Sequence, residues 1–206
     1  MKKLLQDYKA GKVNLSTVLQ KLKTLPYEDL EFAKIDTHRE IRKGFPETIF
    51  CQGKTLLQIS QILIKLPKDQ NILLTKANKN VYASIKKIYA EATYNESART
   101  VVIQRYKPKQ KKGKILVLTA GTSDIPVAEE AVVTAQLMGN KVETVYDVGV
   151  AGVHRLFDIK DKIFDANVII VIAGMEGALA SIVGGLASKP VIAVPTSVGY
   201  GASFHG

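Results

Sequence analysis

The feature that most constrains the fold is a regular alternation of apolar segments and helical patterns after residue 113. The segment Lys114–Thr119 contains a continuous apolar run from Ile115 to Leu118, which is typical of a parallel strand covered on both faces. Further strands are predicted over residues 141–146, 168–172 and 191–194, and helices over 127–138 and 177–186. We therefore expect an α/β fold in this half, a doubly wound parallel sheet with helices on both faces.

Residues before 113 show a less regular α/β pattern. Helices are predicted over 2–9 and 14–24, and Asn14 or Ser16 is the expected N-cap of the second. Beyond Pro26, the pattern predicts short strands over 30–35, 48–51, 72–75 and 99–104, and helices over 56–66 and 81–89.

Segment 107–113, with the sequence KPKQKKG, is the best candidate for a domain boundary. Its charges, its proline and its final glycine favour an exposed, irregular chain. We therefore expect a small N-terminal α/β domain over residues 1–106, a basic linker over 107–113 and a second domain over 114–206.

Positive charge is concentrated in the first half of the chain. The net charge is +10, with a balance of +13 over residues 1–113 and −3 over residues 114–206. A basic half suits an anionic small molecule, nucleic acid, or solubility alone. Aromatic residues do not interleave with the basic run at 105–114 as a base-stacking surface requires, so no nucleic-acid partner is expected.

The composition argues against several other classes of protein. Cys51 is the single cysteine, so an internal disulfide or a cysteine metal cluster cannot form, and we expect it to be a small buried hydrophobe. Three unpaired histidines do not indicate a zinc site. No apolar run is long enough to cross a bilayer, and polar Gln6 and Asp7 interrupt the start of a signal-like segment. We expect a cytoplasmic protein without a membrane partner.

The last predicted strand, 191–194, is followed by twelve residues without a helical pattern. A buried parallel strand needs a helix to cover it. We therefore expect the second domain to be incomplete at its C-terminus, with a helix beyond Gly206.

The turn Gly121-Thr122-Ser123-Asp124 directly follows the first strand of the second domain. Ligands of such sheets bind at the carboxyl ends of strands, where a helix N-terminus favours phosphate. Gly121 would let backbone N–H groups approach an anion, and Thr122 and Ser123 would add hydroxyls. Asp124 could cap the helix or act as a proton carrier. The alternative interpretation is that Ser123 and Asp124 are only N-caps.

The loop 147–155, with the sequence DVGVAGVHR, follows the second strand. His154 and Arg155 on a glycine-rich loop suit a polyanionic ligand. The alternative is an exposed loop with a histidine that starts a helix.

Glu176 follows the third strand within Gly174-Met175-Glu176-Gly177. Burial among small and apolar residues would suit a general acid/base, whereas the alternative is a first-turn glutamate favoured by the helix dipole. Because three such turns follow three successive strands, we expect them to converge on one crevice.

A fourth motif, in the basic half, spans residues 36–47 with the sequence DTHREIRKGFPE. On a helix, Arg39 and Arg42 would share one face with His38 beside them, forming an anion clamp. The alternative is a solvated face with Glu40 as the partner of the arginines.

These motifs resemble, in order and spacing, those of the LarB family of nickel-pincer nucleotide biosynthesis. The resemblance covers the chain from roughly Leu30 to its end and includes the closing sequence PTSVGYGASF. Residues 114–206 also resemble aminoimidazole ribonucleotide carboxylase of the PurE type.

The LarB resemblance implies a carboxylase/hydrolase acting on nicotinic acid adenine dinucleotide. Such an enzyme carboxylates C5 of the pyridinium ring with CO2, cleaves the phosphoanhydride and releases AMP, on the way to the nickel-pincer cofactor of lactate racemase. The resemblance further implies Mg2+ at the phosphoanhydride, with ligands that the sequence does not identify. It also implies a homo-oligomer, because relatives form rings through the C-terminal domain.

The resemblance assigns roles to residues of the motifs. Ser123 and Asp124 match the active-site turn, Arg155 with His154 matches a substrate anchor, and Glu176 matches the carboxylate that removes the C5 proton. Substrate-binding roles are likewise expected for Gly121, Thr122, Asp36, His38, Arg39 and Arg42. The family's nucleophilic cysteine is expected just beyond Gly206, so a chain ending there would bind the dinucleotide without carboxylating it.

Two alternative functions remain open at this point. The first is an aminoimidazole ribonucleotide carboxylase/mutase, which does not require the N-terminal half of this chain. The second is a non-catalytic nucleotide-binding module.

Overall fold

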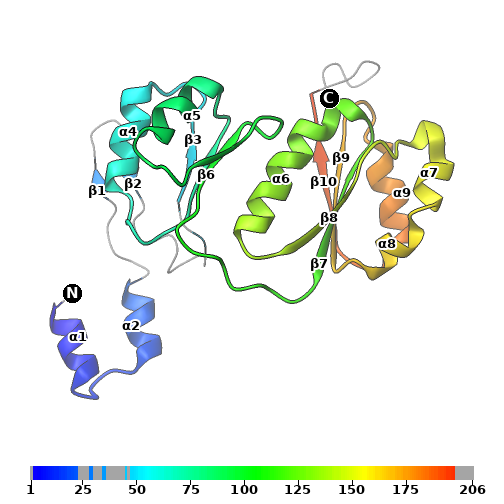
Figure 1. Ribbon diagram of the computed structural model, residues 1–206. Helices are drawn as coiled ribbons and strands as arrows, with labels where there is room; N and C mark the ends of the chain where they lie inside the picture. Colours follow the sequence, from blue (N-terminus) through cyan, green and yellow to red (C-terminus); the bar gives the residue numbers. More distant parts are fainter. Residues whose placement is uncertain (1, 23–27, 30–33, 36–44, 46, 198–206) are drawn as a thin grey trace.

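The computed structural model describes residues 2–22, 28–29, 34–35, 45 and 47–197 (Figure 1). Within this part of the chain lie two four-stranded sheets, each with its own helices. The first sheet is built from residues 48–103 and the second from residues 114–195. The expected α/β class is confirmed.

Two short helices and a small ribbon precede the first sheet. Helices α1 (Lys2–Lys9) and α2 (Leu15–Leu22) agree with the predicted pair, and Asn14 Oδ1 caps α2 by accepting from Thr17 N at 2.8 Å. Strands β1 (Glu28–Asp29) and β2 (Lys34–Ile35) pair antiparallel. The strand predicted over 30–35 is described only where it forms β2.

The first sheet is mixed, with strand order β3-β4-β6-β5. It contains β3 (Thr48–Phe50), β4 (Ile72–Thr75), β5 (Thr93–Asn95) and β6 (Thr100–Ile103), with helices α4 (Leu56–Lys65) and α5 (Lys79–Lys86). These helices and the strands enclose one apolar core. The sequence did not predict β5, because its three residues have no apolar alternation and are held in place by antiparallel pairing with β6.

The second sheet is entirely parallel, with strand order β10-β9-β7-β8. Its strands are β7 (Lys114–Thr119), β8 (Lys141–Val145), β9 (Val168–Ala173) and β10 (Val191–Pro195), close to the predicted ranges. Helix α6 (Ile125–Leu137) covers one face, and α7 (Val153–Phe157), α8 (Lys160–Asp165) and α9 (Ala178–Leu186) cover the other (Figure 1). The predicted doubly wound sheet is therefore confirmed.

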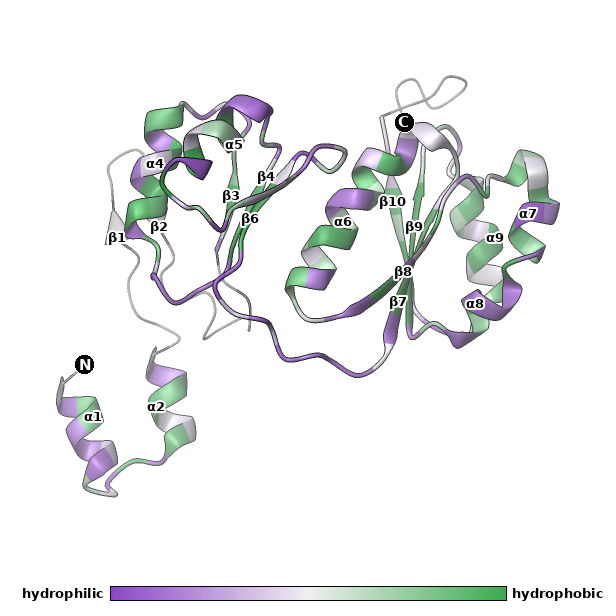
Figure 2. Cartoon of the chain, in the orientation of Figure 1, coloured by the Kyte–Doolittle hydropathy of each residue, from purple (hydrophilic) through white to green (hydrophobic). Residues whose placement is uncertain are grey.

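Alternation along β7 explains why both faces of this sheet are apolar. Leu116 and Leu118 pack with Leu156 and Leu179 from the side of α7 to α9, whereas Val117 packs on the α6 side. All three β7 side chains are fully buried, as expected for a strand covered on both faces. Hydrophobic colouring predominates along much of the central strands (Figure 2).

Strand β10 differs from the expectation of a buried strand. It lies at the sheet edge, pairs only with β9 among the described strands, and leaves Ile192 51% exposed. A strand with one neighbour has one unpaired edge, so its apolar sequence alone does not bury it.

The basic run at 105–114 is anchored at both ends. Arg105 Nη1 donates to the carbonyls of Pro67 and Gln70 at 2.9 and 3.2 Å. Lys114 Nζ lies 2.6 Å from Asp165 Oδ2 and 2.8 Å from Glu143 Oε2, and these hydrogen bonds raise the pKa of Lys114. The residues between these anchors form a hydrophilic connection between the sheets (Figure 2).

Helix α6 joins the second sheet to the first. Lys76 Nζ lies 2.5 Å from Glu130 Oε2, and Asn95 Nδ2 donates to Glu129 Oε2 at 2.9 Å. Glu129 also accepts from the Tyr146 hydroxyl. Burial, together with that bond, raises the pKa of Tyr146 to about 12.

Among the described residues, no helix combines the length and apolar character needed to cross a membrane.

Cys51 is predicted to be unreactive in the folded protein. Its side chain is 4% exposed, and burial raises the pKa of the thiol to about 11, although the nearby Lys54 ammonium acts in the opposite direction. Because the thiolate is the reactive form, a disulfide thiol reagent at pH 8 should leave the native protein unmodified and label one thiol after unfolding in guanidinium. Rapid labelling of the native protein would contradict this placement.

Candidate active site

A cavity of about 480 Å³ opens at the carboxyl ends of β7, β8 and β9. This is the point where the chain order of the strands reverses, because β8 lies on one side of β7 and β9 on the other. Doubly wound sheets bind their ligands at such a point. The three strand-end turns predicted to converge do so: the lining residues are Ala120, Gly121, Ser123, Asp124, Gly149, Val150, Ala151, Arg155, Ala173, Gly174, Met175, Glu176, Ala178 and Leu179.

The turn after β7 is organised by Asp124. A short 3-10 turn over Thr122–Asp124 leads into α6, and the Asp124 side chain is buried. Its Oδ2 accepts from Gly121 N at 3.0 Å, and its Oδ1 accepts from the Thr196 hydroxyl at 2.8 Å. Ser123 lines the cavity and is exposed, whereas Thr122 is exposed outside the lining.

The turn after β8 positions Arg155. Asp147 has a left-handed φ of 61°, its backbone N–H donates to Thr119 Oγ1 at 3.0 Å, and its carboxylate lies 2.5 Å from Arg155 Nη1. The Arg155 side chain remains 39% exposed, so part of the guanidinium can meet a ligand. His154 is exposed on α7 and does not line the cavity.

The turn after β9 carries Glu176. Met175 and Gly177 on either side of it have φ values of 51° and 65°, so the chain reverses sharply between β9 and α9. A left-handed methionine is uncommon, and such residues concentrate at functional sites. Glu176 lines the cavity with Ser123 and Asp124, as expected, but its side chain is exposed, so the burial that would suit a general acid/base is not observed.

Two other predicted features lie away from this cavity. The anion clamp of Asp36, His38, Arg39 and Arg42 lies outside the described residues. Cys51 belongs to the core of the first sheet.

The described residues contain no group of three or more His, Cys, Asp or Glu side chains able to hold a metal ion. In the cavity both Asp124 oxygens accept hydrogen bonds, and Asp147 pairs with Arg155. Magnesium in nucleotide sites takes one or two carboxylates in addition to phosphate oxygens. The described cavity residues therefore do not form a magnesium site by themselves, and we derive no chemical step through the ion.

Sequence reasoning missed three residues that build the cavity. Thr119 and Thr196 are buried hydroxyls that bond across turns, and Asp147 holds Arg155. Thr119 ends a predicted strand, Asp147 directly follows one and Thr196 lies two residues after another, which is the available signal in the sequence. Their partners are not predictable in this way, because Thr196 and Asp124 lie 72 residues apart.

The cavity combines two kinds of chemistry. The first turn of α6 and the Arg155 guanidinium favour an anionic group. Glu176 lies at the mouth of the same cavity, where its carboxylate can accept a proton from a bound ligand. The arrangement thus suits a phosphate-containing substrate and a proton transfer.

Two family models match the chain in succession. The model of the LarB/PurE-like N-terminal domain matches residues 27–105, and the model of AIR carboxylase matches residues 114–203.

Two curated proteins are similar to this chain. An uncharacterized protein of Methanocaldococcus jannaschii is 38% identical over an alignment of 211 positions, which covers 98% of this chain and 82% of that protein. The N5-carboxyaminoimidazole ribonucleotide mutase of the same organism is 38% identical over 84 residues, which is 39% of this chain and 51% of the mutase.

Replacing Thr196 tests the hydrogen bond to Asp124. Thr196→Val keeps the shape but leaves a buried carboxylate oxygen without its donor, so it should destabilise the protein by about 1.5–3 kcal/mol in urea unfolding. Thr196→Ser keeps the hydroxyl and should be clearly more stable than Thr196→Val. Equal stability of the two variants would show that this bond contributes nothing.

Gly149 is predicted to tolerate no side chain. An added Cβ would lie 2.6 Å from the Ala120 carbonyl oxygen, so Gly149→Ala must displace the turn after β7 or β8. We expect a loss of about 1–3 kcal/mol in thermal or urea unfolding. Gly184→Ala is the matched control, because nothing lies within 4 Å of its Cβ and alanine favours helix α9 by up to about 1 kcal/mol. A neutral Gly149→Ala would contradict the close approach of the two turns.

Proposed function

We propose a carboxylase function for this chain, which belongs to the LarB family of proteins with a PurE-like C-terminal domain. The family is enzymatic, of the carboxylase/mutase type, and binds nucleotide substrates. The proposed reaction is carboxylation of the pyridinium ring of nicotinic acid adenine dinucleotide by CO2. The proposed enzyme also hydrolyses the phosphoanhydride and releases AMP, in nickel-pincer cofactor biosynthesis for lactate racemase.

The observation that carries the proposal is the meeting of an anion site and a carboxylate in one cavity. Arg155, the turn before α6 and Glu176 come from three different strand ends and line the same space. The phosphates and the ring carboxylate of the dinucleotide are anions that Arg155 and the turn before α6 can bind. The ring proton can be accepted by Glu176.

Substrate phosphate is assigned to Arg155 and the turn before α6. The guanidinium is already oriented by Asp147, so less side-chain freedom is lost when it binds phosphate. Ser123 is exposed beside the start of α6 and can donate its hydroxyl to a phosphate oxygen. Asp124 is assigned a holding role for this turn, because both of its oxygens are already engaged.

Glu176 is assigned as the base that completes carboxylation. Once the C5 carbon has bonded to CO2, the C5 proton passes to the Glu176 carboxylate, and departure of the added nucleophile then restores the aromatic pyridinium ring. The ring must first be made electron-rich by addition of a nucleophile, which leaves again as the ring re-forms. No thiol lies among the described lining residues, so we assign the nucleophile to no described residue.

Magnesium and a homo-oligomeric assembly form part of the same proposal. A ligand phosphate would bring its own oxygens to the ion, and no described lining residue is assigned as its ligand, because Glu176 is assigned as the base.

The second candidate is N5-carboxyaminoimidazole ribonucleotide mutase activity. The match of 84 residues to the curated mutase favours it. The match of residues 27–105 to the LarB/PurE-like N-terminal domain favours the carboxylase, because the mutase candidate leaves that half of the chain without a role.

The function is tested on the full-length protein with labelled bicarbonate. We expect mass spectrometry to detect a carboxylated mononucleotide and AMP from nicotinic acid adenine dinucleotide, and no conversion of N5-carboxyaminoimidazole ribonucleotide. Glu176→Gln keeps the shape of the side chain and removes its basicity, so carboxylation should fall about a hundredfold or more.

Glu96→Gln is the control for Glu176→Gln. Glu96 is exposed, pairs with Lys79 in the first half of the chain and lies outside the cavity lining, so this variant should retain full activity. Turnover of the ribonucleotide alone would decide for the mutase. Normal carboxylation by Glu176→Gln would remove Glu176 from the mechanism.

A further inference from the structure

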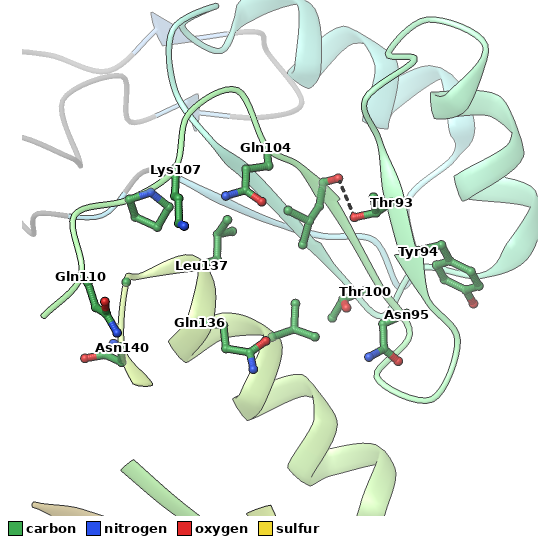
Figure 3. A pocket seen from close by; sticks show the side chains of 14 residues that line it. Thr93, Tyr94, Asn95, Thr100, Gln104, Lys107, Gln110, Gln136, Leu137 and Asn140 are labelled. Atoms are coloured by element: carbon green, nitrogen blue, oxygen red, sulfur yellow. Dashed lines mark hydrogen bonds between the residues drawn. The ribbon is translucent and has the colours of Figure 1, made fainter. Parts of the chain in front are cut away.

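A second cavity, of about 540 Å³, lies between the two sheets (Figure 3). Its walls come from β5, β6, the linker and the C-terminal end of α6. The lining residues are Thr93, Tyr94, Asn95, Thr100, Val102, Gln104, Lys107, Pro108, Gln110, Val133, Gln136, Leu137, Gly139 and Asn140. We call it the interdomain cavity.

The interdomain cavity is separate from the crevice that holds Glu176. The crevice lies at the N-terminal end of α6, beside Asp124, whereas the interdomain cavity lies beside Gln136 at the other end. With a rise of 1.5 Å per residue, the two ends of this helix are roughly 18 Å apart. The two cavities share no lining residue.

The sheet face that lines the interdomain cavity is polar but almost uncharged. Along β6, Val101 and Ile103 point into the core of the first sheet, so Thr100 and Val102 face the cavity. A face packed directly on α6 would be apolar, and an open face would carry charged residues. Hydroxyls and carboxamides on a partly covered face instead suit a ligand that forms hydrogen bonds.

Thr100 supplies the observation that points to a ligand. Its side chain is fully buried in the wall of this cavity, and its Oγ1 has no hydrogen-bond partner among the described residues. Buried hydroxyls almost always have a partner. Figure 3 shows Thr100 on the strand side of the cavity, with Gln136 and Leu137 on the α6 side.

Two carboxamides in the lining are also available to a ligand. Asn95 and Asn140 are engaged, because Asn95 Nδ2 bonds to Glu129 and Asn140 Nδ2 bonds to the carbonyl of Ala135. In contrast, the side chains of Gln110 and Gln136 make no hydrogen bond to any described residue. A carboxamide can donate and accept side by side, as the edge of a purine base requires.

We propose that the interdomain cavity binds a purine nucleoside monophosphate. The base lies between apolar Val102, Val133 and Leu137, with its edge on Gln136 and Thr100, and the phosphate meets Lys107 at the start of the basic linker. The volume is within the usual range for a small-ligand site. In this site Lys107 of the basic linker binds the phosphate of the ligand. The proposal does not depend on the proposed carboxylase activity.

The test is calorimetric titration of the full-length protein with AMP, on a background of Arg155→Ala to weaken the crevice. We expect AMP to bind this variant. Thr100→Val should weaken AMP about fivefold, the effect of one neutral hydrogen bond, without destabilising the protein, because it removes an unpartnered hydroxyl. A purely structural Thr100 would leave AMP affinity unchanged.

Two further variants separate the base from the phosphate. Gln136→Ala should weaken AMP and adenosine alike, whereas Gln61→Ala, an exposed glutamine on helix α4, should change neither. Lys107→Ala should weaken AMP roughly tenfold and leave adenosine unchanged, since the charge-assisted bond needs the phosphate.

Two outcomes would overturn the proposal. One is the absence of AMP binding in Arg155→Ala when the wild-type protein binds it, because the crevice would then be the AMP site. The other is AMP binding that is insensitive to Thr100→Val and Gln136→Ala. Carboxylation assayed without added AMP reports separately on the proposed function.

Discussion

The buried carboxylate of Asp124 is the interaction on which the crevice depends. A carboxylate removed from water is strongly unfavourable unless donors surround it, and here Gly121 N and the Thr196 hydroxyl supply them. Because Thr196 follows the edge strand β10, this pair of bonds ties the turn after β7 to the far side of the sheet, across β9. The β7 side of the crevice is thereby held in place relative to β10.

Helix α6 connects the Asp124 turn to the first sheet and to the interdomain cavity. The Asp124 turn leads directly into its first turn. Glu129 and Glu130 form hydrogen bonds and an ion pair with the first sheet, and the last turn of the helix lines the interdomain cavity. A rigid helix in contact with both sites can transmit a shift at one end to the other, provided that the sheets have two arrangements. The Lys76–Glu130 and Asn95–Glu129 contacts are the bonds that such a shift would have to rearrange.

Conformational strain is concentrated at the same strand ends. Asp147 and Met175 take left-handed backbone angles that L-residues rarely adopt, and Gly149 passes too close to the Ala120 carbonyl for any side chain. The buried residues of β7 and β9 beside these turns can hold them in place. The turns that contain Asp147 and Met175 position Arg155 and Glu176. The Asp124 side chain is instead held by its hydrogen bonds to Gly121 and Thr196.

The sequence by itself determined the parallel sheet and the three turns at its strand ends, because the apolar runs of β7 and β9 are local signals of burial on both faces. It also indicated Ser123, Arg155 and Glu176, since a residue that follows a buried parallel strand must lie at one known edge. Only the tertiary structure decided the exposure of Glu176, the bond from Thr196 to Asp124, the pairing that creates β5 and the cavity around Thr100. Each of these depends on contacts between residues far apart in the chain, and local periodicity carries no information about which distant side chain will supply a hydrogen bond or leave one unmade.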